Sequence, residues 1–522
     1  MSNNLISIAK DSARGSFFLV AGNILSAVIQ AIGVFLLARL LGPDLYGAYT
    51  LTLVVPMLFM QLVDLGVSQG LIKFSASLKV KGEKAKIATF IRNGLLFKLF
   101  ISLASSCFAI LFSDFLATYT VNRPSIAFYI RLASLSIIFY AVSDTAVSTF
   151  IGLDRAEYSA LTINVQALVK STLSILLVAL GLSLSGAITG VVAGALASTF
   201  IGLTILYLKF YKTLNDPKEN GLGFKESIKT IIGYSFPIYL SALLIQLISQ
   251  LQGVILSMYV SDADIGNFRA SSNFITLLSL LIGPIATALF PAFSKLESNN
   301  NELKRFFAIT IKYVTLIVVP ASTAMIIFSE QLNQIIYGPK YVSAPTYLML
   351  QAPIFLLAGL GYQVLNSLFN GANETKTTLK MCSITFLLFI LLSPPLTMQL
   401  SVPGLIIALL ASNLIATFYG AYKAKTTFKV EYPYKTLLLI YAASALSALS
   451  AYITLQITPF STIPKFATAA SVYLITYITL LPLMKAITKQ EIEEITIATE
   501  RIPLIKPIIK LLLKYEAKIV PK

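Results

Sequence analysis

Fourteen long apolar stretches limit what this chain can fold into more than any other feature of its sequence. A helix needs about 20 mostly apolar residues to cross the hydrocarbon core of a bilayer. Hydrophobic residues make up 56% of the 522 positions and charged residues 12%, against roughly 25% charged in a soluble domain. The sequence therefore predicts an all-α membrane protein with about 14 transmembrane helices. The expected spans are 16–38, 46–71, 87–112, 126–150, 157–181, 186–209, 231–258, 266–290, 306–328, 345–369, 377–399, 402–422, 434–456 and 463–484.

The placement of Lys and Arg predicts how the chain is oriented. With the N-terminus in the cytoplasm, the inner segments hold 32 of the 40 basic residues and the outer segments hold 6, while two lie within spans. Cytoplasmic loops are enriched in Lys and Arg. Both termini are therefore expected in the cytoplasm of a plasma-membrane protein. The same asymmetry accounts for the net charge of +17 without a nucleic-acid partner.

An internal repeat divides the first twelve spans into two halves. Residues 186–202 match 404–420, and Gly47 falls against Gly266, at offsets of 218 and 219. The offset covers six spans, an even number, so the copies share one orientation and form a parallel repeat with a substrate path expected between them. The predicted organisation is an N-terminal lobe (1–210), a cytoplasmic loop (211–230), a C-terminal lobe (231–428), two extra helices (429–485) and a cytoplasmic amphipathic tail (486–522). Such a tail would lie on the anionic inner leaflet and contact membrane lipids; a solvated tail is the alternative.

One segment is specific enough to suggest a family. Residues 15–74, and above all the R-x-LGP-x-x-YG-x-Y core from Arg39 to Tyr49, resemble the opening of the polysaccharide-biosynthesis flippases of the multidrug, oligosaccharidyl-lipid and polysaccharide exporter superfamily. Residues 262–296 resemble the matching element of the second half. The resemblance implies two six-helix lobes around a central cavity, two appended helices, and a cargo of lipid-linked oligosaccharide moved from the inner to the outer leaflet. It also makes glycosyltransferases of the same pathway candidate partners.

Two lysines lie in the middle of spans, where an ionisable group is costly and usually faces the bundle interior. Lys98 lies on a polar stripe of span three, and Lys170 does so in span five with Gln166 and Ser174. An ammonium in a low-dielectric cavity is a strong partner for the phosphate or pyrophosphate of a polyprenyl or dolichyl carrier. The alternative is that each lysine snorkels, or pairs with an acid such as Asp144.

Two arginines and several amides complete the predicted substrate site. Arg39 and Arg269 can grip a phosphate with two hydrogen bonds, whereas salt bridges at the outer rim with Asp44 and with Asp262 or Asp264 are the alternative. Amide side chains both donate and accept, as sugar hydroxyls require, although hydrogen bonds between helices are their commoner use. The predicted amide ligands are Asn23, Gln30, Gln246 and Gln250.

Asp64 and Asp144 are the candidate ion-coupling residues. An intramembrane carboxylate can bind Na⁺ or H⁺ and link transport to an ion gradient or the membrane potential; pairing with Lys98, Lys170 or a backbone group is the alternative. Histidine is absent and the two cysteines lie in apolar runs, so the sequence indicates no metal site, no cofactor and no catalytic group. An enzyme is therefore not expected.

The leading hypothesis is a flippase that works by alternating access. A multidrug or cation-coupled antiporter of the same superfamily is the alternative. A membrane glycosyltransferase ranks below both, because the longest expected outer loop, around 112–126, has only about 15 residues and such an enzyme would show a large outer loop or an acidic catalytic pair.

Overall fold

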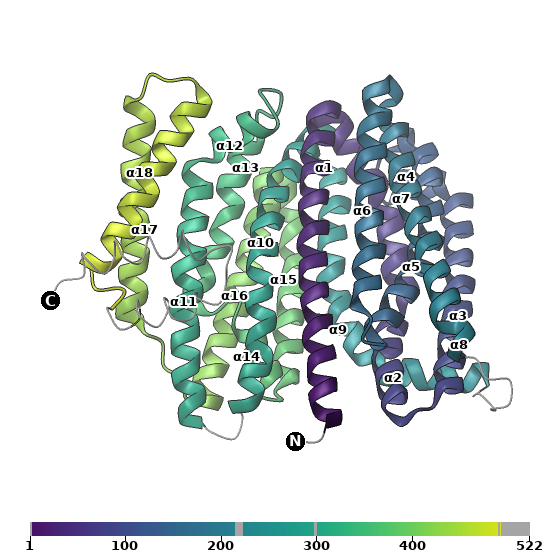
Figure 1. The fold of residues 1–522 in the computed structure, drawn as a ribbon. Helices are drawn as coiled ribbons and strands as arrows, with labels where there is room; N and C mark the ends of the chain where they lie inside the picture. Colours follow the sequence, from purple (N-terminus) through teal and green to yellow (C-terminus); the bar gives the residue numbers. More distant parts are fainter. Residues whose placement is uncertain (1–2, 215–222, 297–299, 489–490, 492–522) are drawn as a thin grey trace. The chain divides into compact units, whose positions relative to one another are not determined.

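The computed structural model describes residues 3–214, 223–296, 300–488 and Glu491, and these form long helices joined by short connections (Figure 1). Every predicted span falls mainly on helix, with turns at 65–66 in the second span and at 361–364 in the tenth. The predicted tail 486–522 lies outside the described residues apart from 486–488 and Glu491, and so does the stretch 215–222 of the predicted loop.

The chain divides into two compact units. The first extends to Asn273 and includes Ile390–Leu405; the second comprises Phe274–Phe389 and the chain from Ile406 onward. The predicted lobe boundaries stay a prediction.

The helices of the first unit are α1 (Asn3–Asp64), α2 (Val67–Lys81), α3 (Lys84–Leu111), α4 (Ser113–Tyr119), η1 (Pro124–Ile126), α5 (Ala127–Gly152), α6 (Ala156–Leu177), η2 (Val178–Leu182), α7 (Ser183–Ile205), η3 (Leu206–Tyr211), α8 (Lys212–Leu214) and α9 (Phe224–Tyr259). Those of the second are α11 (Asn300–Ile327), α12 (Ser329–Ile336), α13 (Ala344–Gln351), η4 (Ala352–Leu360), α14 (Leu365–Gly371), α17 (Tyr434–Ile457) and α18 (Thr462–Leu483). Residues of both units occur in α10 (Asp262–Leu296), α15 (Thr375–Leu400) and α16 (Val402–Phe428).

Among the described residues, ten helices are long and apolar enough to cross a membrane. An eleventh span is added if the pair Ala344–Leu360 and Leu365–Gly371, bent by 44°, counts as one. Two of the ten are runs of 61 and 56 residues, Ala21–Lys81 and Ala156–Tyr211. Each run has the length of two crossings at about 20 residues per crossing, and each covers two predicted spans. The predicted all-helical membrane fold is therefore confirmed.

The LGP motif marks the break between the first two spans. Gly42 has φ 74° and ψ 171°, so the helical backbone of α1 is interrupted there. A positive φ is strained for residues with a Cβ but not for glycine. Pro43 follows at the first position of the next helical segment, where its missing N–H costs no helical hydrogen bond. The motif therefore has a structural role in ending one span and beginning the next.

The glycines that pair in the repeat also pair in space. A Cβ added to Gly47 would lie 1.9 Å from the carbonyl oxygen of Asp262, and one added to Gly266 would lie 1.9 Å from that of Pro43. Asp262 stands 219 positions after Pro43, as Gly266 does after Gly47. Reciprocal contacts of this kind are the mark of a two-fold relation, in which residue i meets j and j meets i. The close crossing of α1 and α10 thus follows the repeat seen in the sequence.

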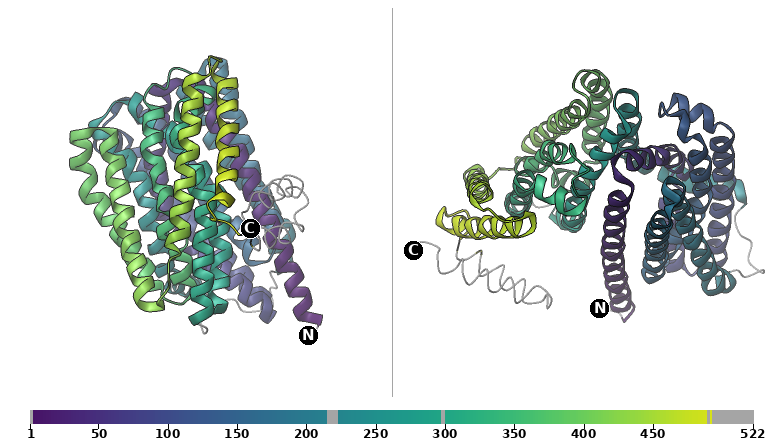
Figure 2. Two further views of the ribbon diagram at one scale, coloured as in Figure 1. Left: turned by 90° about the vertical axis from the view of Figure 1, so that its left-hand side faces the viewer. Right: turned by 90° about the horizontal axis from the view of Figure 1, so that it is seen from above.

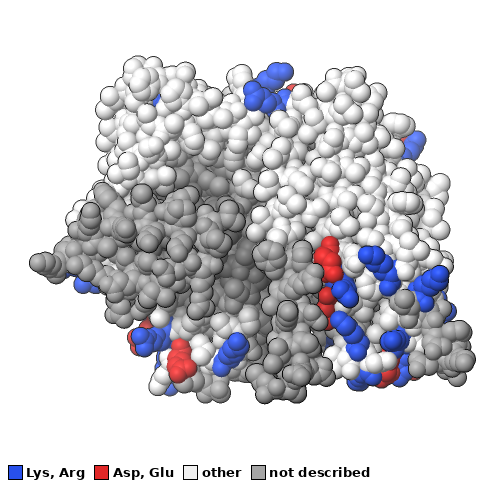
Figure 3. Space-filling model, in the orientation of Figure 1, with Lys and Arg blue, Asp and Glu red and all other residues white. Residues whose placement is uncertain are grey.

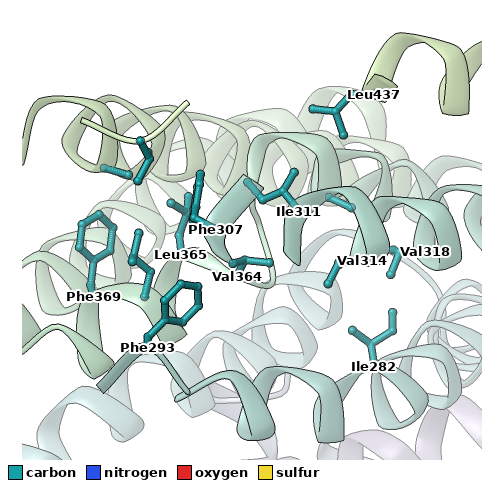
Figure 4. Close-up of a cluster of buried hydrophobic side chains, with 14 of the residues drawn as sticks. Ile282, Phe293, Phe307, Ile311, Val314, Val318, Val364, Leu365, Phe369 and Leu437 are labelled. Carbon is teal, nitrogen blue, oxygen red and sulfur yellow. The ribbon is translucent and has the colours of Figure 1, made fainter. Parts of the chain in front are cut away.

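The core of the second unit is built from aromatic and branched side chains of α10, α11, η4, α14 and α17. Phe293, Phe307 and Phe369 are fully buried there, with Ile311 and Val318 beside them (Figure 4). On the other side of α11, the hydroxyls of Tyr473 and Tyr477 donate to its carbonyl groups over 2.8 Å each. Figure 2 shows α17 and α18 side by side in this unit.

A turn interrupts the helix within span 345–369, and a side chain of α17 makes hydrogen bonds with the backbone next to this turn. Gly361 has φ 93° and ends η4. The hydroxyl of Tyr441 donates to the carbonyl of Leu356 and accepts a hydrogen bond of 3.2 Å from the N–H of Gly359. Backbone polar groups in a membrane must find partners within the protein, and Tyr441 of α17 provides a hydrogen-bond partner for each of these two groups.

Charged side chains of the first unit gather at one end of its helices. On the face shown in Figure 3, Lys and Arg cluster toward one end of this unit and the band above them is almost uncharged. The end of α2 and the start of α3 contribute Lys79, Lys81, Lys84 and Lys86. An uncharged band beside a basic end is what a membrane-spanning unit with basic inner loops should show.

Candidate functional site

The site begins at the break between α1 and α2. Leu65 and Gly66 both have positive φ, 44° and 84°, and separate the two helices. The carboxylate of Asp64 then accepts hydrogen bonds from the N–H groups of Gly66 and Ser68, both at 3.2 Å, and from the Ser68 hydroxyl at 2.6 Å. Asp64 therefore caps the first turn of α2, where acidic side chains are stabilising.

Lys98 enters the same cluster from α3. Its ammonium lies 2.7 Å from Oδ1 of Asp64, 2.6 Å from Oδ2 of Asp144 on α5, and 2.6 Å from the Ser68 hydroxyl. A lysine has three N–H donors and no acceptor. These contacts occupy all three donors, so a ligand reaches this ammonium only if one of them opens.

The cluster carries more negative than positive charge, and it presents its negative side. The Lys98 side chain is only 1% exposed, whereas that of Asp144 is 50% exposed. Oδ2 of Asp144 contacts both Lys98 and Ser68, while Oδ1 takes part in neither contact. Two carboxylates share one ammonium, which leaves one negative charge in surplus.

A pocket of about 570 Å³ opens beside this cluster, within the first unit. Asp64, Lys98 and Asp144 are its charged lining residues. Its neutral polar lining comes mostly from amides and phenols of α1, α2, α5, α6 and α9, namely Gln61, Gln69, Gln166, Gln246, Gln250, Tyr140 and Tyr239. The volume falls in the range of roughly 300–1,000 Å³ that small-molecule sites occupy. The pocket can therefore hold a polar group inside an otherwise apolar bundle.

One lining amide has hydrogen-bonding capacity to spare. The hydroxyl of Tyr239 donates to the backbone carbonyl of Gln61 over 2.9 Å. The side-chain oxygen of Gln61 is buried without a hydrogen-bond partner among the described residues. A buried unpaired acceptor is costly, and a donor on a bound ligand would satisfy it.

Lys170 lies elsewhere, in a crevice between α1 and α6. This crevice measures about 10 Å³ and is lined also by Gln30, Gly33 and Ser171. A Cβ added to Gly33 would lie 2.2 Å from the hydroxyl of Ser171, so the helices touch here. The two mid-span lysines that the sequence grouped together therefore have different surroundings, and Lys170 lies outside the pocket beside Lys98.

The remaining predicted ligands divide between the pocket and other places. Gln246 and Gln250 line the pocket. Arg269 donates to the backbone carbonyl of Ser249 over 3.3 Å. The side chains of Arg39, Asn23 and Gln30 are exposed on α1, and Gln30 donates to the Ser26 hydroxyl over 2.9 Å.

Only some of the observed ion pairs are those that the sequence offered as alternatives to substrate binding. Lys98 is paired with Asp64 and Asp144, and a pair with an acid such as Asp144 was the alternative for this lysine. Asp262, a suggested partner of Arg269, is instead bound to Arg123 over 2.6 Å. Contact of the predicted ligands with a substrate stays a prediction.

Sequence reasoning missed Ser68, Gln61 and Tyr239. Ser68 lies four residues after Asp64 and two residues after Gly66, in the first turn of α2, and that spacing is the signal that could have found it. Gln166 was assigned to the stripe of Lys170 but lines the pocket beside Asp144. Gln61 and Tyr239 are joined across 178 positions, which no local pattern reveals.

Curated relatives match this chain over most of its length. A "Probable low-salt glycan biosynthesis flippase Agl15" of Haloferax volcanii is 21% identical over 434 residues, covering 81% of this chain and 86% of the relative. "Stage V sporulation protein B" of Bacillus subtilis is 21% identical over 519 residues, covering 93% and 97%.

Solved structures share the fold. A lipid II flippase MurJ in an inward closed conformation aligns with a TM-score of 0.72 at 16% identity, covering 90% of this chain and 98% of that one. An inward-facing multidrug resistance MATE family transporter of the MOP superfamily aligns with a TM-score of 0.61 at 15% identity, covering 77% and 94%. Residues 12–297, more than half of the chain, match the family described as "Polysaccharide biosynthesis protein". The chain therefore belongs to the polysaccharide biosynthesis protein family and is a multi-pass membrane protein.

Proposed function

We propose that this protein is a flippase that moves a lipid-linked oligosaccharide from the inner to the outer leaflet by alternating access. The observation that carries the proposal is the pocket of about 570 Å³ lined by five glutamines and two tyrosines. Polar side chains are expensive inside a membrane protein and usually mark a substrate path. The names of two relatives, a glycan biosynthesis flippase and a lipid II flippase, support the same class of cargo.

In this proposal the amides hold the sugar. Gln246 and Gln250 lie one helical turn apart on α9, so their side chains lie on one face of the helix and can donate to and accept from sugar hydroxyls. Contacts of the lipid phosphate with Lys98, Lys170, Arg39 and Arg269 stay predictions. For Lys98, such a contact requires the cluster to open first, because its three donors are occupied.

In this proposal Asp64 and Asp144 couple transport of the substrate to the binding of H⁺ or Na⁺. The single hydroxyl proton of Ser68 can serve only one of the two carboxylates it touches. A proton held by Asp144 would complete the second contact and would cancel the surplus charge. Binding and release of H⁺ or Na⁺ at Asp144 would then change how firmly Lys98 joins α3 to α5.

The proposal can be tested with the full chain in lipid vesicles. The probe is polyprenyl diphosphate-linked N-acetylglucosamine, and its arrival in the outer leaflet is read by a membrane-impermeant galactosyltransferase. We expect transport by the natural protein, a loss of at least about tenfold for Gln250→Leu, and no loss for Gln456→Leu, a matched change at an exposed position of α17. Absence of transport under a proton gradient, a sodium gradient and neither would overturn the proposal.

The surplus negative charge favours the antiporter of cationic compounds as the second candidate function. Mid-span lysines would repel a cationic drug, but Lys98 is neutralised and Asp144 is exposed to the pocket. The same vesicles distinguish the two functions, because an antiporter would move ethidium against a counter-gradient of H⁺ or Na⁺ and would leave the lipid-linked sugar in place.

Orientation in the plasma membrane is part of the proposal. The distribution of Lys and Arg supports a cytoplasmic position for both termini and for the loop 211–230. In a background with Cys107→Ser and Cys382→Ser, we expect Asn220→Cys to react with an impermeant maleimide only after the cells are permeabilised. Labelling of Asn220→Cys in intact cells would show that the loop faces the outside and would contradict the proposed orientation.

A further inference from the structure

The charge that the pocket presents restricts the sugar it can take. Two carboxylates and one ammonium belong to its lining, and the other described lining residues are uncharged. Of these three groups, Asp144 faces the pocket with half of its side chain exposed, while Lys98 is 1% exposed and fully hydrogen-bonded. A group that enters this pocket therefore meets a carboxylate and not an ammonium.

The low polarity around the pocket strengthens this effect. Two like charges repel in inverse proportion to the effective dielectric constant, which falls from about 80 in water to about 20 near protein charges. A carboxylate on the cargo would also leave its water shell without gaining a cation, because the donors of Lys98 are already used. Neutral hydroxyls lose nothing comparable, since glutamines replace their hydrogen bonds to water.

We propose that the pocket selects a sugar that is either uncharged or carries an ammonium group, and that it excludes acidic sugars. This inference rests on the proposed function and names the chemical class of its cargo. An ammonium would lie against the free Oδ1 of Asp144, the hydroxyls would pair with Gln246 and Gln250, and a donor would satisfy the side-chain oxygen of Gln61. The expected order of affinity is amino sugar, then neutral sugar, then acidic sugar.

The test compares three soluble sugars of one ring configuration. Methyl glucosaminide, methyl N-acetylglucosaminide and methyl glucuronide are titrated against the full chain in detergent at pH 7, and binding is read from the thermal stabilisation of the protein. We expect the glucosaminide to bind at least about tenfold more tightly than the glucuronide, as one charge contact of this kind implies. A glucuronide that binds as tightly as the other two would overturn the inference.

The variant Asp144→Asn provides the matched control. It leaves one ammonium paired with one carboxylate, Lys98 with Asp64 at 2.7 Å, so the cluster stays balanced and the protein is expected to fold. The preference for the glucosaminide over the glucuronide should fall to about twofold or less, and binding of N-acetylglucosaminide by the variant shows that it is folded. An unchanged preference in this variant would refute the role of Asp144.

The transport assay separates the two proposals. The vesicles are loaded in turn with polyprenyl diphosphate carriers of N-acetylglucosamine and glucuronic acid. Transport of the first carrier alone supports both proposals, and equal transport of both carriers contradicts only the selectivity. No transport of either carrier, together with the expected order for the soluble sugars, contradicts the flippase and retains the pocket's preference.

Discussion

Replacing Lys98 by glutamine should destabilise the protein as well as impair its transport activity. The substitution removes an ammonium that is 1% exposed and that lies within 2.7 Å of two carboxylates. Removal of one partner of a buried ion pair costs about 3–5 kcal/mol, because the remaining charge stays buried without compensation. Asp144 is half exposed and Asp64 a quarter exposed, so water screens part of the effect. We therefore expect about 3 kcal/mol for Lys98→Gln, at the low end of that range.

A second substitution distinguishes lost charge balance from lost packing. In Lys98→Gln/Asp144→Asn one carboxylate remains, and Asp64 still caps α2 through the N–H groups of Gly66 and Ser68. The double variant should recover roughly half of the lost free energy of unfolding, because only one uncompensated charge is left.

The assay is the free energy of unfolding measured by steric trapping in lipid bicelles. The control is Lys170→Gln, which removes a mid-span lysine that makes no ion pair with a described residue, and which should cost less than about 1 kcal/mol. A Lys98→Gln variant as stable as the control would refute the reasoning. So would a double variant less stable than Lys98→Gln.

Three further predictions follow from particular contacts. Gly47→Ala should cost at least about 2 kcal/mol of unfolding free energy, because its Cβ would meet a backbone oxygen at 1.9 Å; near-neutral stability would contradict the tight crossing. Tyr441→Phe should cost about 1–3 kcal/mol of unfolding free energy by removing the two hydrogen bonds that its hydroxyl makes with the Leu356 carbonyl and the Gly359 N–H, whereas the same change at the exposed Tyr434 should be silent in thermal unfolding. Burial alone would raise the pKa of Glu491, but the hydrogen bond from Lys312 at 2.5 Å holds that pKa below its ordinary value of 4.5. Lys312→Met should therefore lower the free energy of unfolding at neutral pH, and this loss should vanish as the pH falls through the lowered pKa of Glu491. A loss that does not depend on pH would show that the ion pair between Lys312 and Glu491 is not its source.

The sequence was sufficient for the membrane fold because the signals involved are local. Each span is a continuous apolar run, and Gly42 followed by Pro43 marks a break that the structure confirms. The repeat was visible because its copies keep the same residues at one offset. That the paired segments around Gly47 and Gly266 also contact each other was learned only from the structure.

The candidate site was only partly predictable, because it depends on which helix faces meet. Lys98 and Asp144 were recognised as unusual from their mid-span positions, and their pairing was foreseen only as an alternative to substrate binding. Lys170 looked equivalent to Lys98, yet it lies in a crevice of about 10 Å³ and not in the pocket. Helical periodicity gives the direction of a side chain relative to its own helix but not the neighbour that it faces.

Hydropathy, charge placement and the motif around Gly42 by themselves determined that this chain spans a membrane and which family it resembles, and its internal repetition predicts a duplicated helical unit. Only the tertiary structure decided that Lys98 is shared between Asp64 and Asp144, and that a carboxylate rather than an ammonium faces the pocket. The physical reason is that the charge of a site is a sum over groups separated by 34 and 46 positions in the chain, and that sum is defined only once the helices that carry them have packed.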